Sequence, residues 1–90
     1  MQAARIIRQP RAIYPEDLKA QGITGTVIIK AVISTTGEPL NPQVVNSAVN
    51  FGLAQAALDA VRQWRYQPTL LNGQPVEVTT TIQVTFELDQ

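Results

Sequence analysis

The residue types that most often carry catalysis or bind metals are missing from this chain. It contains no cysteine and no histidine among its 90 residues, which excludes a thiol nucleophile, a Ser-His-Asp triad, a Cys/His zinc site and a disulfide framework. The adjacent carboxylates Glu16 and Asp17 are expected on a short helix, where neighbouring side chains point apart and form no acid–base pair. We therefore expect no catalytic residues, no metal, no cofactor and no enzymatic activity.

The net charge and the length of the chain exclude further classes of protein. Seven basic and seven acidic residues give a formal net charge of zero, whereas a nucleic-acid-binding domain normally carries a basic excess. No apolar stretch approaches the ~18 residues of a membrane helix, and no secretory signal is visible at the start, so we expect any anchor or export signal to lie outside this sequence. The length fits one domain with a small core, which predicts a marginally stable monomer that gains from a partner.

The chemistry that remains is backbone hydrogen bonding by an exposed strand. Residues 76–88 alternate between apolar and polar side chains, which predicts a half-buried strand of an antiparallel sheet. One face carries Val76, Val78, Thr80, Ile82, Val84, Phe86 and Leu88, and the other carries Glu77, Thr79, Thr81, Gln83, Thr85, Glu87 and Asp89. An unpaired strand edge is a template for another strand. Because carboxylates guard only the ends of the polar face, this strand is the candidate binding edge.

Two helices are predicted before this strand. The first covers residues 14–22, with Pro15 at its first position, carboxylates in its first turn and Gly22 in the left-handed position that ends it. The second follows the capping residue Asn50 and runs to about Trp64 or Arg65. Its apolar residues recur at helical spacing and form one stripe of Leu53, Ala56, Ala57, Ala60, Val61 and Trp64.

Two further strands are predicted between the helices. Residues 25–34 alternate and end at a Thr36-Gly37 turn, and residues 43–47 form a short second strand. Pro39 and Pro42 are expected to keep the residues between them irregular. After the second helix, Asn72-Gly73 predicts a two-residue hairpin that joins residues 66–71 to the last strand.

This order of elements predicts an α+β fold of the type αββαβ. We expect a three-stranded antiparallel sheet with its first strand in the middle and two helices packed on one face. A right-handed crossover brings the last strand beside the first and parallel to the second. Residues 1–13 are expected to form an N-terminal arm that is mainly a solvated tail, and residues 14–90 to form the domain.

Three residues have both a structural and a binding interpretation. Trp64 lies on the apolar stripe, which favours core packing over a role as a binding hot spot. Arg65 is expected to cap the second helix or pair with a carboxylate in preference to contacting a partner. Tyr14 is expected to pack at the entry to the first helix in preference to contacting a ligand.

In order and spacing, these residues resemble the C-terminal domain of the TonB family of energy transducers over about residues 11–88. The matching segments are Tyr14-Pro15, Gly22-Ile23, Gly25-Thr26-Val27, Thr36-Gly37, Val44-Val45 with Ser47, Ala56-Ala57-Leu58-Asp59-Ala60-Val61, Trp64-Arg65-Tyr66-Gln67-Pro68 and Asn72-Gly73-Gln74-Pro75-Val76. Residues 14–90 are therefore interpreted as a TonB-like C-terminal domain. The chain departs from the family pattern at Thr36, where Asp is commoner, at Pro39 and Pro42, and at Gly52, where a larger residue is usual.

The resemblance implies a periplasmic interaction domain that is tethered to the inner membrane in the full-length protein and linked there to an energising complex. The implied partner is a short extended segment at the N-terminus of an outer-membrane TonB-dependent transporter, added as a strand beside the last strand. The partner-binding residues that this implies are Thr79, Thr80, Thr81, Ile82, Gln83, Val84, Thr85 and Phe86, with Arg11 where the arm approaches the docked strand.

Two other roles fit the same domain. Similar domains at the C-terminus of membrane sensor or peptidase-type proteins have no transport role, and an open edge beside a small core also fits a dimerisation module. We expect the isolated domain to form a homodimer. The transporter and its substrate are left open by the sequence, as is the question of which alternate residues of the last strand direct their backbone groups outward.

Overall fold

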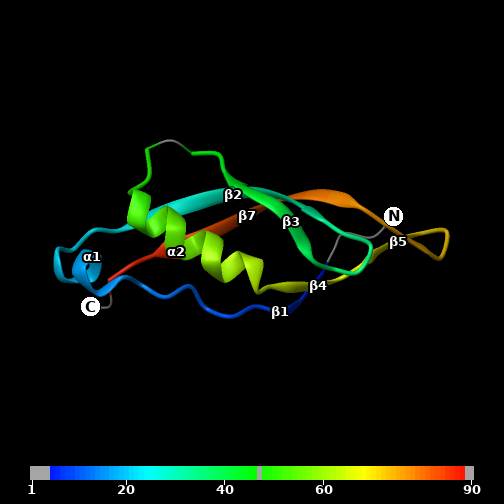
Figure 1. Cartoon of the computed structure of the whole chain (residues 1–90), viewed down its shortest axis with the longest axis horizontal. Helices are drawn as coiled ribbons and strands as arrows, with labels where there is room; N and C mark the ends of the chain where they lie inside the picture. The colour runs from blue at the N-terminus through cyan, green and yellow to red at the C-terminus, as the bar shows by residue number, and fades with distance from the viewer. Residues whose placement is uncertain (1–4, 47, 89–90) are drawn as a thin grey trace.

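The centre of the molecule is a three-stranded antiparallel sheet (Figure 1). The computed structural model describes residues 5–46 and 48–88. The strands of the sheet are, in order, β3 (Pro39–Val44), β2 (Gly25–Ile33) and β7 (Val78–Phe86). β2 pairs with β7 over the full length of both strands. The predicted α+β fold, with β2 in the middle and β7 parallel to β3, is therefore confirmed.

α2 (Phe51–Arg62) lies across one face of this sheet (Figure 1). The Asn50 side chain accepts hydrogen bonds from two backbone N–H groups of the first turn at 2.8 and 3.3 Å, as predicted for an N-cap. At the other end, Arg65 donates to the backbone oxygen of Arg62 at 3.1 Å. Arg65 therefore caps the helix, which confirms its structural interpretation.

The core confirms the packing interpretation of Trp64. Its side chain is 5% exposed and belongs to the cluster formed between α2 and the inner face of the sheet. The buried members of this cluster are Val27, Ile29, Ala31, Ile33, Leu53, Ala54, Ala57, Val61, Trp64, Tyr66, Ile82, Val84 and Phe86. The predicted alternation of β2 and β7 therefore places the apolar face of each strand against α2.

α1 (Glu16–Ala20) lies at the end of the sheet where β2 begins and β7 ends (Figure 1). Pro15 occupies its N-cap and not its first helical position. Gly22 has φ 71°, as predicted, and the next N–H, from Ile23, bonds back to the Leu18 oxygen at 3.0 Å. Neither α1 nor α2, the helices of the described residues, is long and apolar enough to cross a membrane.

The glycine at position 52 is explained by the contact between the two helices. A Cβ atom added to Gly52 would lie 2.6 Å from Leu18 Cδ1, which is closer than real Cβ contacts come. The side chain from α1 therefore occupies the space that a larger residue would need at the start of α2.

The prediction for β3 is wrong at both ends, and residues between Pro39 and Pro42, expected to be irregular, belong to the strand. We expected residues 43–47, but the strand begins at Pro39 and ends at Val44, and Ser47 lies outside the described residues. The prolines are tolerated because β3 is an edge strand. A register shift accompanies Asn41, whose φ of 47° marks a bulge beside Pro42.

Two small antiparallel ladders complete the fold. β5 (Thr69–Leu71) and β6 (Gln74–Val76) form the predicted hairpin, with Asn72 and Gly73 at φ 53° and 81°. β1 (Arg5–Arg8) pairs with β4 (Arg65–Gln67). Part of the predicted solvated tail is therefore a strand, although its side chains are exposed.

Candidate functional site

The two edges of the central sheet differ in their capacity to accept another strand. β3 presents Pro39 and Pro42, which lack backbone donors, and its ladder is interrupted by the bulge at Asn41. β7 presents nine consecutive residues in unbroken register with β2, and none of them is proline. The candidate site is therefore the outer edge of β7.

Backbone groups of β2 show which residues of β7 face outward. The Ile28 N–H donates to Asn46 Oδ1 at 2.9 Å, and the Ile28 oxygen accepts from the Val45 N–H at 2.8 Å. The Thr26 oxygen accepts from Asn46 Nδ2 at 2.7 Å. Thr26 and Ile28 thus direct their backbone groups toward β3. Because these groups alternate along a strand, the residues between them face β7.

The register between β2 and β7 then assigns the open edge. Thr85 lies opposite Thr26, and Gln83 lies opposite Ile28. In an antiparallel pair, residues opposite each other direct their backbone groups either both toward or both away from the other strand. Gln83 and Thr85, and by the same alternation Thr81, therefore direct their N–H and C=O groups outward. Within the described residues, no other segment forms a backbone hydrogen bond with these groups.

The predicted site residues divide between the two faces of β7. The exposed residues are Thr79, Thr81, Gln83 and Thr85, whereas Thr80 is half-buried and Ile82, Val84 and Phe86 are buried in the core. The exposed group carries the outward backbone groups, and the buried group supplies the ladder to β2. Direct contact with an added strand is consequently expected from the exposed group.

An open groove, here called the β7 groove, runs along the last part of this edge. One side is β7 and its continuation, from Gln83 to Glu87. The other side is formed by residues 9–12 and Tyr14, with Lys19 of α1 and the core residue Trp64. Arg11, expected near the docked strand, is exposed and lines this groove. A segment paired with β7 would lie between the strand and the residues that link β1 to α1.

The chemistry of this edge is hydrogen bonding and shape. Within the part of the chain that the structure describes, no three His, Cys, Asp or Glu side chains gather where they could hold a metal ion. Glu16 and Asp17 are exposed neighbours in the first turn of α1. Burial raises the pKa of Tyr66 above its usual 10.0, and this residue is a core residue of β4. None of these three side chains lines the β7 groove.

Two contacts that shape the site had no signal in the sequence. The Asn46 amide takes the place of a backbone partner for Thr26 and Ile28, which extends the ladder on the β3 side. The Trp64 indole N–H donates to the Pro10 oxygen at 2.9 Å and so binds the linking residues. An asparagine after a strand, or a tryptophan on an apolar stripe, looks the same in a sequence with or without such a bond.

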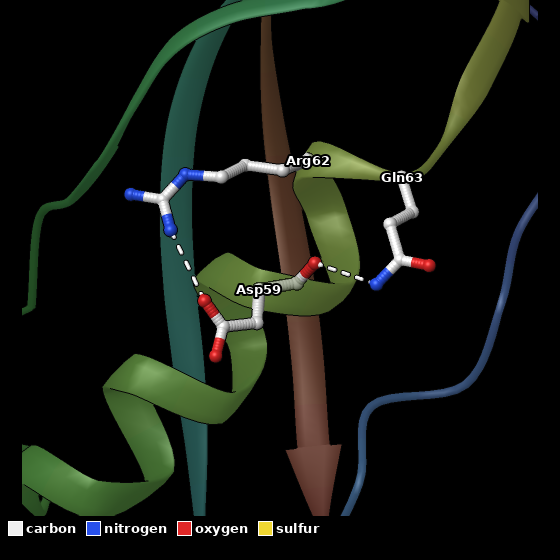
Figure 2. A network of polar contacts seen from close by, with 3 residues as sticks. All are labelled: Asp59, Arg62 and Gln63. Carbon is white, nitrogen blue, oxygen red and sulfur yellow. Dashed lines mark hydrogen bonds and ion pairs between the residues drawn. The ribbon is translucent and has the colours of Figure 1, made fainter.

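A polar network on α2 involves residues that do not line the β7 groove (Figure 2). Arg62 Nη1 lies 3.1 Å from Asp59 Oδ1, and Gln63 Nε2 donates to the Asp59 backbone oxygen at 3.3 Å. The Arg62 and Asp59 side chains are 56% and 69% exposed, and exposed ion pairs contribute little to stability. This network therefore lies at the last turn of α2, outside the β7 groove, and contributes little to stability.

Comparisons of this sequence with a family model and with known proteins all point to one family. The family model described as Gram-negative bacterial TonB protein C-terminal matches residues 10–88. Protein TonB of Vibrio cholerae is 35% identical over 81 residues, which cover 90% of this chain and 32% of that protein. Protein TonB of Xanthomonas campestris is 32% identical over 76 residues, which cover 84% of this chain and 34% of that protein. The chain thus spans about a third of the length of these relatives.

Solved structures share the fold. The solution NMR structure of the Pseudomonas aeruginosa TonB CTD has a TM-score of 0.83 at 23% identity, over 100% of this chain and 91% of that one. The NMR solution structure of the Helicobacter pylori TonB-CTD has a TM-score of 0.66 at 24% identity, over 88% and 71% of the two chains. These likenesses establish the fold, while the family model and the sequence relatives establish descent. This chain therefore belongs to the TonB C-terminal domain family.

Proposed function

We propose that this domain is the periplasmic interaction domain of a TonB-type energy transducer for outer-membrane transport. We propose further that it binds an extended N-terminal segment of an outer-membrane transporter by adding it as a strand to β7. Family membership supports the transducer role. The observation that carries strand addition is the row of outward backbone groups at Thr81, Gln83 and Thr85, which no other segment of the described chain engages through its backbone.

Strand addition explains why β7 itself is rich in β-forming residues and carries no charged residue. In this mode, main-chain hydrogen bonds supply affinity and alternate side chains tune specificity. Outward groups occur at every second residue of β7, so a peptide of about six extended residues engages three of them. Replacing an exposed side chain should therefore matter much less than removing a backbone donor.

In the full-length protein, the proposed role requires a connection to the inner membrane and to an energising complex there. We propose that this connection is made by parts of the full-length protein other than this domain. We also propose that the isolated domain forms a homodimer through the same edge, since two unpaired β7 strands can satisfy each other. Sedimentation of the isolated domain should show association that increases with concentration, and a monomer up to millimolar concentration would contradict it.

Two proline substitutions at neighbouring positions test strand addition. Gln83→Pro removes an outward donor and leaves the ladder to β2 intact, whereas Val84→Pro removes a donor that faces β2. We expect the first variant to fold, by circular dichroism, but to lose binding of a transporter-derived peptide in calorimetry. We expect the second to unfold.

The matched control is Gln83→Ala, which keeps the backbone donor and removes the side chain. It should bind the peptide within a few-fold of the unsubstituted domain. The ligands are ten-residue peptides from the periplasmic N-terminal segments of several TonB-dependent transporters. If a folded Gln83→Pro domain binds these peptides as the unsubstituted domain does, or if none of the peptides binds the unsubstituted domain, the proposal is wrong.

A further inference from the structure

The segment that links β1 to α1, here called the linking segment (residues 9–14), forms the outer wall of the β7 groove with residues 9–12 and Tyr14. We propose that the indole N–H of Trp64 holds this linking segment in place, which makes Trp64 a positioning residue for strand addition as well as a core residue. The inference rests on the proposed function, because it concerns how the same groove is kept ready for a peptide.

The linking segment is attached to the core by side chains at both of its ends. Near its start, Trp64 Nε1 donates to the Pro10 oxygen at 2.9 Å. Near its end, the Tyr14 hydroxyl donates to the Ile23 oxygen, and the Tyr14 ring meets Phe86 edge-on with centroids 5.3 Å apart and planes at 70°. Trp64 and Phe86 are 5% and 4% exposed, so both attachments lead to fixed positions in the core.

Backbone pairing does not hold the linking segment. Within the described residues, none of residues 9–14 forms a backbone–backbone hydrogen bond with another element. Pro10 itself has no N–H to offer. Ala12 packs against the core between the two side-chain attachments, and the attachments are the hydrogen bonds that hold the segment on either side of it. Removal of either one should therefore increase the motion of the segment.

A fixed wall raises affinity because it is ordered before the peptide arrives. Ordering a mobile segment at the moment of binding subtracts conformational entropy from the affinity. The groove lies between this wall and Gln83 to Glu87, so a strand that pairs with β7 must contact both sides. Trp64 itself lines the groove, but its only polar group, the indole N–H, is bound to the Pro10 oxygen, so this group acts on the peptide through the wall.

Trp64→Phe separates this role from core packing. Phenylalanine keeps an aromatic ring in the core but has no donor for the Pro10 oxygen. We expect the variant to fold, with ¹⁵N relaxation showing increased motion of the Gln9, Arg11 and Ala12 amides. The Kd for the same transporter-derived peptides should rise about two- to twelve-fold, the range that one net hydrogen bond allows.

Two further variants make the test decisive. Ile33→Val lowers stability from the core at the opposite end of β7, beside Val78, and should leave both the segment's motion and the Kd unchanged. Tyr14→Phe removes the hydroxyl bond to Ile23 but keeps the ring on Phe86. It should weaken binding in the same direction, because it frees the other end of the same wall. If Trp64→Phe fails to fold, an unchanged Kd for Tyr14→Phe contradicts the premise that a fixed wall raises affinity, and with it the positioning role.

The outcomes distinguish this inference from the proposed function. If the unsubstituted domain binds the peptides, Gln83→Pro abolishes binding, and Trp64→Phe keeps the Kd or the order of the linking segment unchanged, strand addition stands and the positioning role is wrong. If Ile33→Val weakens binding as much as Trp64→Phe does, the effect is one of stability and the positioning role is again wrong. If the unsubstituted domain binds none of the peptides, the proposed function itself fails.

Discussion

Gly37→Ala should be among the most damaging single-methyl changes in this domain. Gly37 lies in the turn between β2 and β3 with φ 88°, and its oxygen accepts from the Tyr66 N–H at 2.9 Å. A Cβ atom there would lie 1.9 Å from the Tyr66 oxygen. That backbone atom belongs to a residue that is 4% exposed, so the turn must move away from β4.

The loss of unfolding free energy expected for Gly37→Ala is the sum of three contributions. The left-handed conformation costs a non-glycine residue about 1–2 kcal/mol. Loss of the hydrogen bond to Tyr66 adds about 0.5–1.5 kcal/mol. Displacing the turn from a packed core adds about 1–3 kcal/mol. We expect a total of about 3 kcal/mol or more, which in a domain of this size lowers the Tm by roughly 12 °C or more.

Gly73→Ala provides the matched control. Gly73 has φ 81°, but a Cβ atom there would meet nothing within 4 Å. This variant should lose only the conformational contribution, about 1–2 kcal/mol. The effect of Gly→Ala on the unfolded chain is common to both variants, so it cancels in the difference. Urea unfolding followed by circular dichroism measures both, and equal losses of stability would refute the close approach of Gly37 to β4.

Three further changes probe other contacts. Asn46→Ala should lower the free energy of unfolding by about 1–3 kcal/mol in urea, because it leaves backbone groups of Thr26 and Ile28 without the partners that the amide supplies. An unchanged urea midpoint would contradict the role of Asn46 as a partner for β2. Thr69→Val should be neutral or stabilising in the same assay, since the Thr69 hydroxyl is buried and finds no hydrogen-bond partner among the described residues. A loss of more than about 1 kcal/mol would show that the hydroxyl has one. Burial raises the pKa of Tyr66 in the folded state above 10.0, so the contribution of the neutral Tyr66 to stability is complete below that pH and is lost as the pH rises through the folded pKa. The domain should therefore lose stability above about pH 10, and a Tyr66→Phe variant should lose less. Identical pH profiles of stability for the two proteins would be evidence against the pKa shift.

The sequence predicted the elements whose burial pattern is strong. The alternation of β7, the stripe on α2, the cap at Asn50 and the hairpin at Asn72-Gly73 all depend on local residue types, and each is present in the structure. Those features are set by chemistry within a few residues of each other, which is why pattern analysis finds them.

The features that were missed depend on distant partners. Pro39 argues against a strand when it is considered alone, and only the edge position of β3 makes it acceptable. β1 has no alternation and forms because β4 lies beside it. Likewise, the outward direction of Gln83 is fixed by where β2 bonds to Asn46, a contact 18 residues along the chain from Ile28. No local pattern contains that information.

The two edges of the central sheet also differ in how they are protected against pairing with another strand. β3 carries prolines and a bulge, which are devices that prevent another strand from docking. β7 has neither over its nine residues. This contrast favours a selected pairing edge over a merely unprotected one, and it is independent of the family assignment.

Amide hydrogen exchange of β7 tests the central claim most directly. In the free domain, kept dilute enough to be monomeric, the outward amides of Thr81, Gln83 and Thr85 should exchange rapidly, while the amides of Ile82 and Val84, which face β2, are protected. Addition of a saturating transporter-derived peptide should slow the outward set by at least about tenfold, as expected for amides that gain hydrogen bonds, and leave the inward set unchanged. If the peptide binds but the outward amides continue to exchange at their free rates, the peptide is held elsewhere and strand addition to β7 is contradicted.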